Sequence, residues 1–292
     1  MRTVFRSATL FVGDYRCRPA CGQCGAEEHS LSDEIVFVRA GLFVKHLGHT
    51  QVVGNPNRMV FFNRVDPYRV SHPVPGGDDC TVFALAPPVL TDLLRSVNPG
   101  GHADGDRPFQ VSDAPLEAPL FLRHLKVLRA IQRRVLTDVA AEEAVVDLTE
   151  CSVRAALAAR GVRSPRRPGT TRAHREAARA AELLLTSQYR EPLSLDAIAR
   201  AVHLSPFHLC RVFREQTGVS IHAYRNRLRL RAALPPLAES RSDLTELALE
   251  LGFADHSHFT NAFRREFGLT PSAFRRSVRS ERLREMSRTL QV

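Results

Sequence analysis

The C-terminal half of the sequence contains an internal repeat with a spacing of 50 residues. Ser205–Gly218 (SPFHLCRVFREQTG) aligns with Asp255–Gly268 (DHSHFTNAFRREFG), so that a helix-capping residue opens each copy and a glycine closes it. A shorter apolar segment precedes each copy, at Ile198–Val202 and at Leu247–Leu251. Each unit is therefore predicted to be a helix, a tight turn and a second helix.

The second helix of each unit has an apolar stripe that can pack on the first helix. The stripe consists of Leu209 and Phe213 in the first copy and of Phe259 and Phe263 in the second. Ser205 with Pro206, and Asp255, are residues suited to begin these helices. In a helix-turn-helix, the polar face of the second helix enters the major groove of DNA, and helix N-termini offer backbone N–H groups to phosphates.

The positive charge of the chain is concentrated in the same half. The net charge is +10, and residues 160–292 hold 24 basic and 13 acidic side chains. Such a cationic segment indicates an anionic partner, and double-stranded DNA is the first candidate. The alternative is a pair of ordinary helical hairpins whose basic residues form a solvated surface. The repeat, the caps and the charge together favour DNA binding.

The residues around the second unit follow an ordered pattern. They are Leu247-Ala248, Gly252-Phe253-Ala254-Asp255, Phe259, Phe263-Arg264, Gly268, Pro271 and Phe274-Arg275. This pattern resembles that of the AraC/XylS transcriptional regulators, and the resemblance covers about 173–280. It implies two helix-turn-helix units joined by a linker helix, with both recognition helices in successive major grooves. The chain is therefore expected to be a sequence-specific regulator and not an enzyme, with RNA polymerase as a further candidate partner.

The same resemblance assigns DNA contacts to particular side chains. Contacts with base edges are expected from Phe207, Cys210 and Arg211 in the first unit and from His256, Ser257, Thr260 and Asn261 in the second. Arg214, Arg264 and Arg265 are expected at phosphates, which position a protein without specifying sequence. Arg211 is the strongest single candidate, because a bidentate arginine–guanine pair contributes roughly 1–3 kcal/mol of discrimination.

Two features depart from the AraC/XylS pattern. Leu234-Pro235-Pro236-Leu237 stands where the linker helix of the family continues. A proline inside a helix costs roughly 3 kcal/mol or more, so the linker helix is predicted to kink or stop near Ala233. Such a break would loosen the spacing of the two recognition helices. The small thiol of Cys210, at a position expected to touch bases, predicts weaker or shape-based readout by the first unit.

Residues 1–160 are predicted to form an effector-sensing domain. Short apolar runs between turn residues predict strands over about 1–94, at Ile35–Val38, Leu42–Val44, Val52–Val53, Val60–Phe62 and Val82–Leu85. The segment 96–119 is rich in Gly, Pro and Asp and predicts a connector. Helical periodicity predicts two helices over about 117–160, with Phe121, Leu125, Leu128 and Val135 on one face of the first. The composition of 161–172 predicts a linker before the DNA-binding domain of 173–292.

The N-terminal strands resemble a cupin-type barrel. The resemblance rests on Glu27-x-His29, Glu34–Val38, Gly41, Val60–Phe62 and His72. The expected fold class is therefore α+β, with a cupin-like β-barrel, a helical pair and then an all-α double helix-turn-helix domain. Metal-binding cupins carry a histidine where this chain has Glu27, so a pocket for an unknown small molecule is expected instead of a cupin enzyme. The helical pair either packs on its own domain or forms a homodimer contact.

Three cysteines lie within eight residues of the N-terminal half. Cys17, Cys21, Cys24 and His29 could complete a tetrahedral zinc site. The neighbouring Arg16 and Arg18 also suit a redox-sensing thiol, and inert thiols are the third alternative. The string Cys-Arg-Pro-Ala-Cys resembles the methyl-accepting domain of Ada-type DNA repair proteins, but the second Cys-x-x-Cys pair of that family is missing. A methyl-accepting DNA repair and regulatory protein is therefore an alternative function.

The sequence also indicates where in the cell the protein is located and how specifically it binds DNA. No run of 18 apolar residues occurs, and the charged N-terminus does not resemble a secretory signal, so a cytoplasmic location without membrane insertion is expected. A general DNA-binding protein that recognises only phosphates is the alternative to a sequence-specific regulator.

Overall fold

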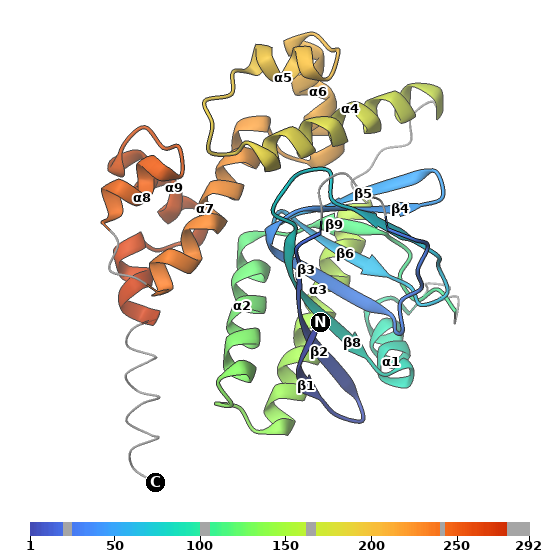
Figure 1. The fold of residues 1–292 in the computed structure, drawn as a ribbon. Coiled ribbons are helices and arrows are strands. Elements are labelled where there is room, and N and C mark those ends of the chain that lie inside the picture. Colours follow the sequence, from blue (N-terminus) through green and yellow to red (C-terminus); the bar gives the residue numbers. More distant parts are fainter. Residues whose placement is uncertain (20–24, 100–105, 162–167, 240–242, 279–292) are drawn as a thin grey trace. The chain divides into compact units, whose positions relative to one another are not determined.

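The computed structural model describes residues 1–19, 25–99, 106–161, 168–239 and 243–278, and it divides the chain into two units (Figure 1). The units are Met1–Arg172 and Ala173–Val292. The first contains sheets and helices, and the described part of the second is helical, so the chain is of mixed α and β structure as expected. In the parts of the chain that the structure describes, no helix is long and apolar enough to cross a membrane.

The first unit contains two antiparallel sheets. Their strands are β1 (Arg2–Arg6), β2 (Leu10–Cys17), β3 (Glu34–Gly41), β4 (Phe43–Leu47), β5 (Thr50–Gly54), β6 (Arg58–Phe62), β7 (Arg69–Ser71), β8 (Asp78–Leu85) and β9 (Asp113–Pro115). One sheet has the order β1-β2-β8-β3-β6-β9 and the other β5-β4-β7. The apolar runs of the sequence lie in or beside β3, β4, β5, β6 and β8, which confirms these strands.

The two sheets share an apolar core. Val36, Val60 and Val82 come from the larger sheet and Phe43 and Val52 from the smaller, and all five are buried in one cluster. This packing follows from the alternation of side chains along each strand. Among the described strands, no ladder joins the two sheets into a closed ring, so a cupin barrel is not confirmed.

A lysine lies within this core. The Lys45 side chain is almost fully buried, its Nζ donates to the Phe61 carbonyl at 2.7 Å, and it lies 3.7 Å from the centroid of the Phe62 ring. Burial lowers the pKa of Lys45 to about 8, because removing water disfavours the ammonium form. The carbonyl and the ring face replace part of the lost hydration.

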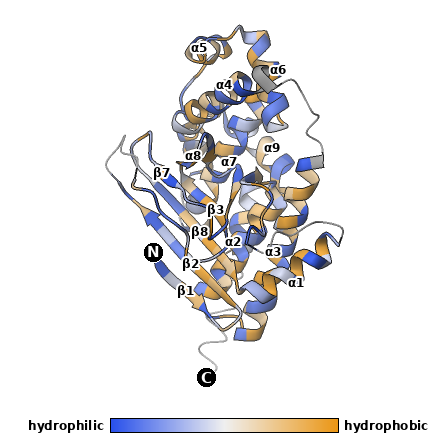
Figure 2. Cartoon of the chain, turned by 90° about the vertical axis from the view of Figure 1, so that its right-hand side faces the viewer, coloured by the Kyte–Doolittle hydropathy of each residue, from blue (hydrophilic) through white to orange (hydrophobic). Residues whose placement is uncertain are grey.

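Three helices accompany the sheets: α1 (Pro87–Val97), α2 (Ala118–Gln132) and α3 (Asp138–Gly161). Helix α1 was not predicted, because its beginning falls in the segment expected to be strands. Two prolines suit its first turn, and it buries Leu90 and Leu93 while its other face is hydrophilic (Figure 2). The predicted connector also contains β9, which pairs with β6.

The predicted boundaries of two helical segments need correction. Helix α2 ends at Gln132, so Val135 is not on its apolar face but is 43% exposed. The left-handed backbone of Arg134, at φ 54°, follows the end of the helix. Helix α3 reaches Gly161, and α4 (Pro168–Ser187) begins at Pro168, so helices enter the predicted 161–172 linker from both ends.

The second unit consists of α4 followed by two helix-turn-helix units and their connection. The remaining elements are α5 (Leu195–Ala201), α6 (Pro206–Thr217), α7 (Ile221–Glu239), α8 (Leu244–Glu250) and α9 (His256–Phe267), with helical residues at 271–278. The four stripe residues of α6 and α9 are fully buried, as are Ala199 and Ala248 in the preceding helices. The double helix-turn-helix architecture is thus confirmed.

Helix α7 connects the two helix-turn-helix units, and it does not stop where the sequence predicts. It continues through Pro235 and Pro236 to Glu239, so of the two expected outcomes, a kink or a stop near Ala233, the stop is wrong. Pro235 is exposed, whereas Leu234 and Leu237 are buried on the opposite side. Burial of a leucine contributes about 1.5–3 kcal/mol, so two of them offset much of the cost of the two prolines, which is roughly 3 kcal/mol or more each.

Two arginines of α7, the buried Arg229 and the half-buried Arg225, join the helix to the turn before α5 and to the second helix-turn-helix unit. Arg229 Nε donates to the Tyr189 carbonyl at 2.6 Å, and its guanidinium lies 5.6 Å from the centroid of the Phe253 ring in the second unit. Arg225 donates to the carbonyls of Tyr189 and Leu193 at 3.1 and 3.2 Å. Burial, followed by the charge of Arg225, lowers the pKa of Arg229 to about 10. We call this set of contacts the Arg229 joint.

Gly252 packs against the Arg229 joint. Its φ of +80° is in the left-handed region, and a Cβ there would lie 2.3 Å from the Arg190 carbonyl oxygen and 2.6 Å from Arg229 Nη2. Gly268, at the end of α9, has a similar φ of +77° but nothing within 4 Å of the position of a Cβ. The two glycines therefore share a backbone requirement and differ in steric surroundings.

Replacing Pro235 by alanine should raise the free energy of unfolding by about 2 kcal/mol. The alanine restores a backbone donor and removes the ring clash, and part of this gain is offset by the greater entropy of the unfolded chain. Urea denaturation monitored by circular dichroism measures the change. Pro206→Ala is the control, because proline suits the first turn of α6. Equal or lower stability of Pro235→Ala would show that α7 is not strained by this residue.

Gly252→Ala should destabilise the second unit more than Gly268→Ala does. Both variants bear the left-handed penalty of about 1–2 kcal/mol, but only the Cβ at residue 252 meets backbone and the Arg229 side chain. Comparing the two midpoints of urea unfolding isolates the steric contribution. If the two variants unfold at the same denaturant concentration, Gly252 does not need this close approach.

Candidate nucleic-acid interface

Helices α6 and α9 begin and end in the same way. The Ser205 hydroxyl accepts a hydrogen bond from the His208 backbone N–H at 3.3 Å, and Asp255 Oδ1 accepts one from His258 at 2.7 Å. Both helices end at glycines with positive φ, which is the backbone that favours glycine. The caps predicted from the repeat are therefore confirmed, and they fix where each recognition helix starts.

Helix α6 has an exposed face opposite its buried stripe. Phe207, Cys210, Arg211 and Arg214 follow the i, i+3, i+4, i+7 spacing of one helix face, and all four are exposed. Phe207 is 82% exposed, which is unusual for an aromatic side chain of a folded unit. The structure thus brings the predicted contacts of the first unit together on one surface.

Helix α9 has the corresponding surface. Ser257, Asn261, Arg264 and Arg265 are exposed, while His256 and Thr260 are half-buried. The last two contact each other, with 3.4 Å between His256 Nε2 and Thr260 Oγ1. The predicted contacts of the second unit therefore include four solvent-exposed side chains and a partly covered pair at the start of the helix.

The arginines of these two surfaces differ from others in the second unit. In the described parts of the chain, Arg211, Arg214 and Arg264 form no ion pair, whereas Arg200 pairs with Asp196 at 3.1 Å. Burial lowers the pKa of the nearby His222, and His258, Arg229, Arg265 and Arg225 lower it further. This accumulation of positive charge suits contact with phosphates.

Sequence reasoning missed the Arg229 joint. It counted the arginines of α7 only as part of the positive charge of this half of the chain. The available signal was the spacing of Arg225 and Arg229 by four residues, about one helical turn, which places both on one face of the helix. Arg229 is buried and Arg225 is half-buried, so neither belongs to the exposed surfaces of α6 and α9.

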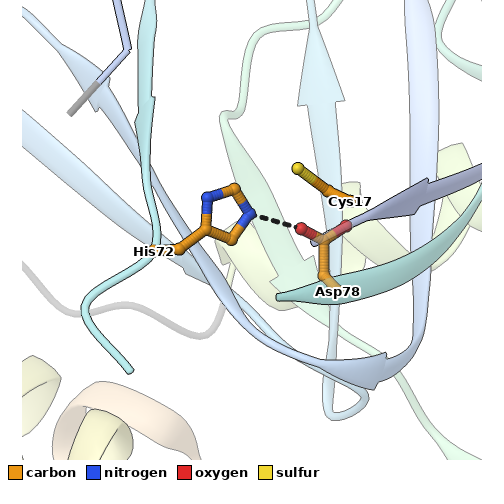
Figure 3. A group of neighbouring side chains, drawn as sticks. All are labelled: Cys17, His72 and Asp78. Carbon is orange, nitrogen blue, oxygen red and sulfur yellow. Dashed lines mark hydrogen bonds and ion pairs between the residues drawn. The ribbon is translucent and has the colours of Figure 1, made fainter. Parts of the chain in front are cut away.

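The predicted metal ligands in the first unit are not brought together by the described residues. Cys21 and Cys24 lie outside those residues, and His29 is exposed. Cys17, at the end of β2, lies instead beside His72 and Asp78 (Figure 3). His72 Nε2 and Asp78 Oδ1 are 2.6 Å apart, and both side chains are buried.

The first unit also contains a cavity of about 270 Å³. Its wall includes β6, α1 and α3 and combines apolar side chains such as Phe61 and Leu157 with the polar Asn98, Gln110 and Arg160. An apolar cavity with a few polar groups is the usual form of a small-molecule site. This cavity is not the barrel interior that the cupin resemblance implies.

Comparisons with known proteins concern mainly the second unit. A helix-turn-helix domain model matches residues 198–277. The transcriptional activator RhaS of Escherichia coli is 38% identical over 91 residues, which are 31% of this chain and 33% of RhaS. The transcriptional regulator GlxA of Rhizobium meliloti is 41% identical over 85 residues, 29% of this chain and 26% of GlxA.

A crystal structure of an AraC-type transcriptional regulator from Chromobacterium violaceum is 30% identical, covers 36% of this chain and 93% of that chain, and has a TM-score of 0.34. The chain spans about a third of the length of RhaS and about a quarter of that of GlxA. Those relatives are transcriptional regulators, which agrees with the expectation that this chain is not an enzyme. The repeated helix-turn-helix units and these matches show that the second unit of this chain belongs to the AraC/XylS family of transcriptional regulators.

Proposed function

We propose that the chain is a sequence-specific transcription regulator that reads double-stranded DNA with α6 and α9. The observation that carries the proposal is the repeat itself. Two capped helices with buried apolar stripes present exposed polar faces at equivalent positions. The continuous α7 and the Arg229 joint support a fixed spacing of the two helices, as contact with successive grooves requires.

The exposed side chains divide between base edges and phosphates. Arg211 suits guanine, and the exposed ring of Phe207 suits the methyl group of thymine. Ser257 and Asn261 provide hydrogen-bonding groups on the second helix. Arg214, Arg264 and Arg265 suit phosphates, which position the protein without reading sequence.

The first unit is proposed as the sensing part. Its two-sheet core and the cavity of about 270 Å³ support a small-molecule effector, for which Arg160 and Asn98 offer polar contacts. A cupin-like fold, dimer contact through α2 and α3, and contact with RNA polymerase are further parts of the proposal. An effector can act only if its affinity differs between two arrangements of the protein.

Arg211→Ala should reduce sequence discrimination, whereas Arg214→Ala should weaken binding to all DNA. A bidentate arginine is worth roughly 1–3 kcal/mol against the wrong base, so the ratio of cognate to mismatched affinity should fall about 10- to 100-fold. Loss of a phosphate contact should reduce the salt slope by about 1. Fluorescence anisotropy with duplexes selected from a random pool, at several salt concentrations, measures both quantities.

Arg200→Ala is the matched control for these two variants. Arg200 is an exposed arginine of α5 that already pairs with Asp196, so its removal changes the net charge without touching either recognition helix. If Arg200→Ala and Arg211→Ala lower discrimination equally, α6 does not read bases. If wild-type protein binds selected and random duplexes equally at fixed salt, the chain is a general DNA-binding protein.

A further inference from the structure

Three side chains of metal-ligand type meet where the two sheets of the first unit come together. Cys17 ends β2 and Asp78 begins β8, and the two residues are directly opposite each other in the antiparallel ladder. His72 follows β7 of the other sheet. The Cys17 Sγ, a ring nitrogen of His72 and a carboxylate oxygen of Asp78 all lie within 4.8 Å of one another, and Figure 3 shows the three side chains directed toward one point.

We propose that Cys17, His72 and Asp78 bind one divalent transition-metal ion of the Zn²⁺ type. Thiolate, imidazole and carboxylate are the three ligand classes that zinc uses in proteins. Three protein ligands leave a fourth position for water or another ligand. This set shares only Cys17 with the ligands predicted from the cysteine cluster.

Backbone packing holds the ligands in place. Gly77 has a φ of +65°, and a Cβ on it would lie 2.0 Å from the Cys17 carbonyl oxygen, so only glycine lets the turn before Asp78 approach β2 this closely. Arg18 Nη1 donates to the carbonyls of Cys17 and Asp78 at 2.7 and 3.0 Å. The relative positions of two ligands are therefore fixed by main-chain contacts, which is the preorganisation that a metal site needs.

The distances suit replacement of a hydrogen bond by an ion. His72 Nε2 and Asp78 Oδ1 are 2.6 Å apart, and two ligands of a tetrahedral zinc, each bonded at about 2.0 Å, are about 3.3 Å apart. For this pair of ligands, metal binding thus requires the two atoms to move apart by less than about 1 Å. The Cys17 thiol releases its proton, and the His72 proton moves from Nε2 to Nδ1, so that Nε2 can bind the metal.

Asp78 has a further partner that orients it. Cys80 Sγ donates to Asp78 Oδ2 at 2.9 Å, which leaves Oδ1 directed toward His72. Contacts of this kind behind a ligand fix its orientation in protein metal sites. Cys80 is buried and lies on the same strand as Asp78, two residues further along.

The same geometry argues against a thiol activated by a histidine–carboxylate pair. In such a triad, one ring nitrogen contacts the carboxylate and the opposite nitrogen contacts the nucleophile. Here the His72 nitrogen that bonds Asp78 is also the one on the side of Cys17 (Figure 3). A single ion between the three groups accounts for this arrangement.

The test is zinc binding by the full-length protein in the absence of DNA. Chelator-treated protein is titrated with Zn²⁺ against a colorimetric competitor, and metal content is measured by mass spectrometry. We expect one Zn²⁺ per chain. Cys17→Ser, His72→Ala and Asp78→Asn should each weaken the affinity by at least about 100-fold, since loss of even an outer contact costs 10- to 100-fold. With Co²⁺ in place of Zn²⁺, the thiolate charge-transfer band should disappear in Cys17→Ser.

His29→Ala is the matched control, because His29 is exposed and was the histidine predicted from sequence. It should retain wild-type zinc affinity. Circular dichroism checks that each variant folds. If His72→Ala does not fold, Asp78→Asn, which keeps the shape of the side chain, replaces it in the test. Absence of stoichiometric metal in the wild type overturns the proposal. So does loss of binding in His29→Ala with retention in His72→Ala, which would identify the ligand set of the cysteine cluster instead.

Discussion

The contacts of Arg229 are the constraint on which the proposed reading of DNA by this chain depends. The buried guanidinium donates to the Tyr189 carbonyl, in the turn before α5, and lies over the Phe253 ring of the second helix-turn-helix unit, so it joins both to α7. Its charge is tolerated because the carbonyl accepts a hydrogen bond and the ring face attracts a cation. Gly252 has no side chain because the same joint occupies that space. The exposed faces of α6 and α9 can act together only if this joint holds.

The first unit is stabilised by different interactions from the second. Its sheets are held by an apolar core, and polar groups are placed where the sheets meet or where helices cover them. Lys45 is buried with a carbonyl and a ring face as neighbours, whereas Cys17, His72 and Asp78 gather at the junction of the sheets. The proposed metal ion and the proposed effector would occupy different places, since none of the three ligands lines the cavity beside α1 and α3.

Local sequence signals predicted the elements that depend on neighbouring residues. Caps, apolar stripes and closing glycines act within one helix, so α6 and α9 were predicted with their burial and their exposed faces. Helix α1 was missed because its prolines and short length resemble the turn-rich strands before it. The predicted end of α7 at its prolines was wrong. The destabilising effect of the prolines can be read from the sequence, but the burial of Leu234 and Leu237, which counters it, is a property of the tertiary structure.

The sequence by itself determined that the second unit is a repeated helix-turn-helix and which side chains point away from its core. Periodicity and capping are properties of consecutive residues, and they are readable without the fold. The tertiary structure alone decided which distant residues meet. It placed His72, and not His29, beside Cys17, because β2 pairs with β8 across about 60 residues of chain and the end of β7, in the other sheet, lies against this pair. It also showed that Arg229 is a buried joint, since its partners belong to other helices and turns.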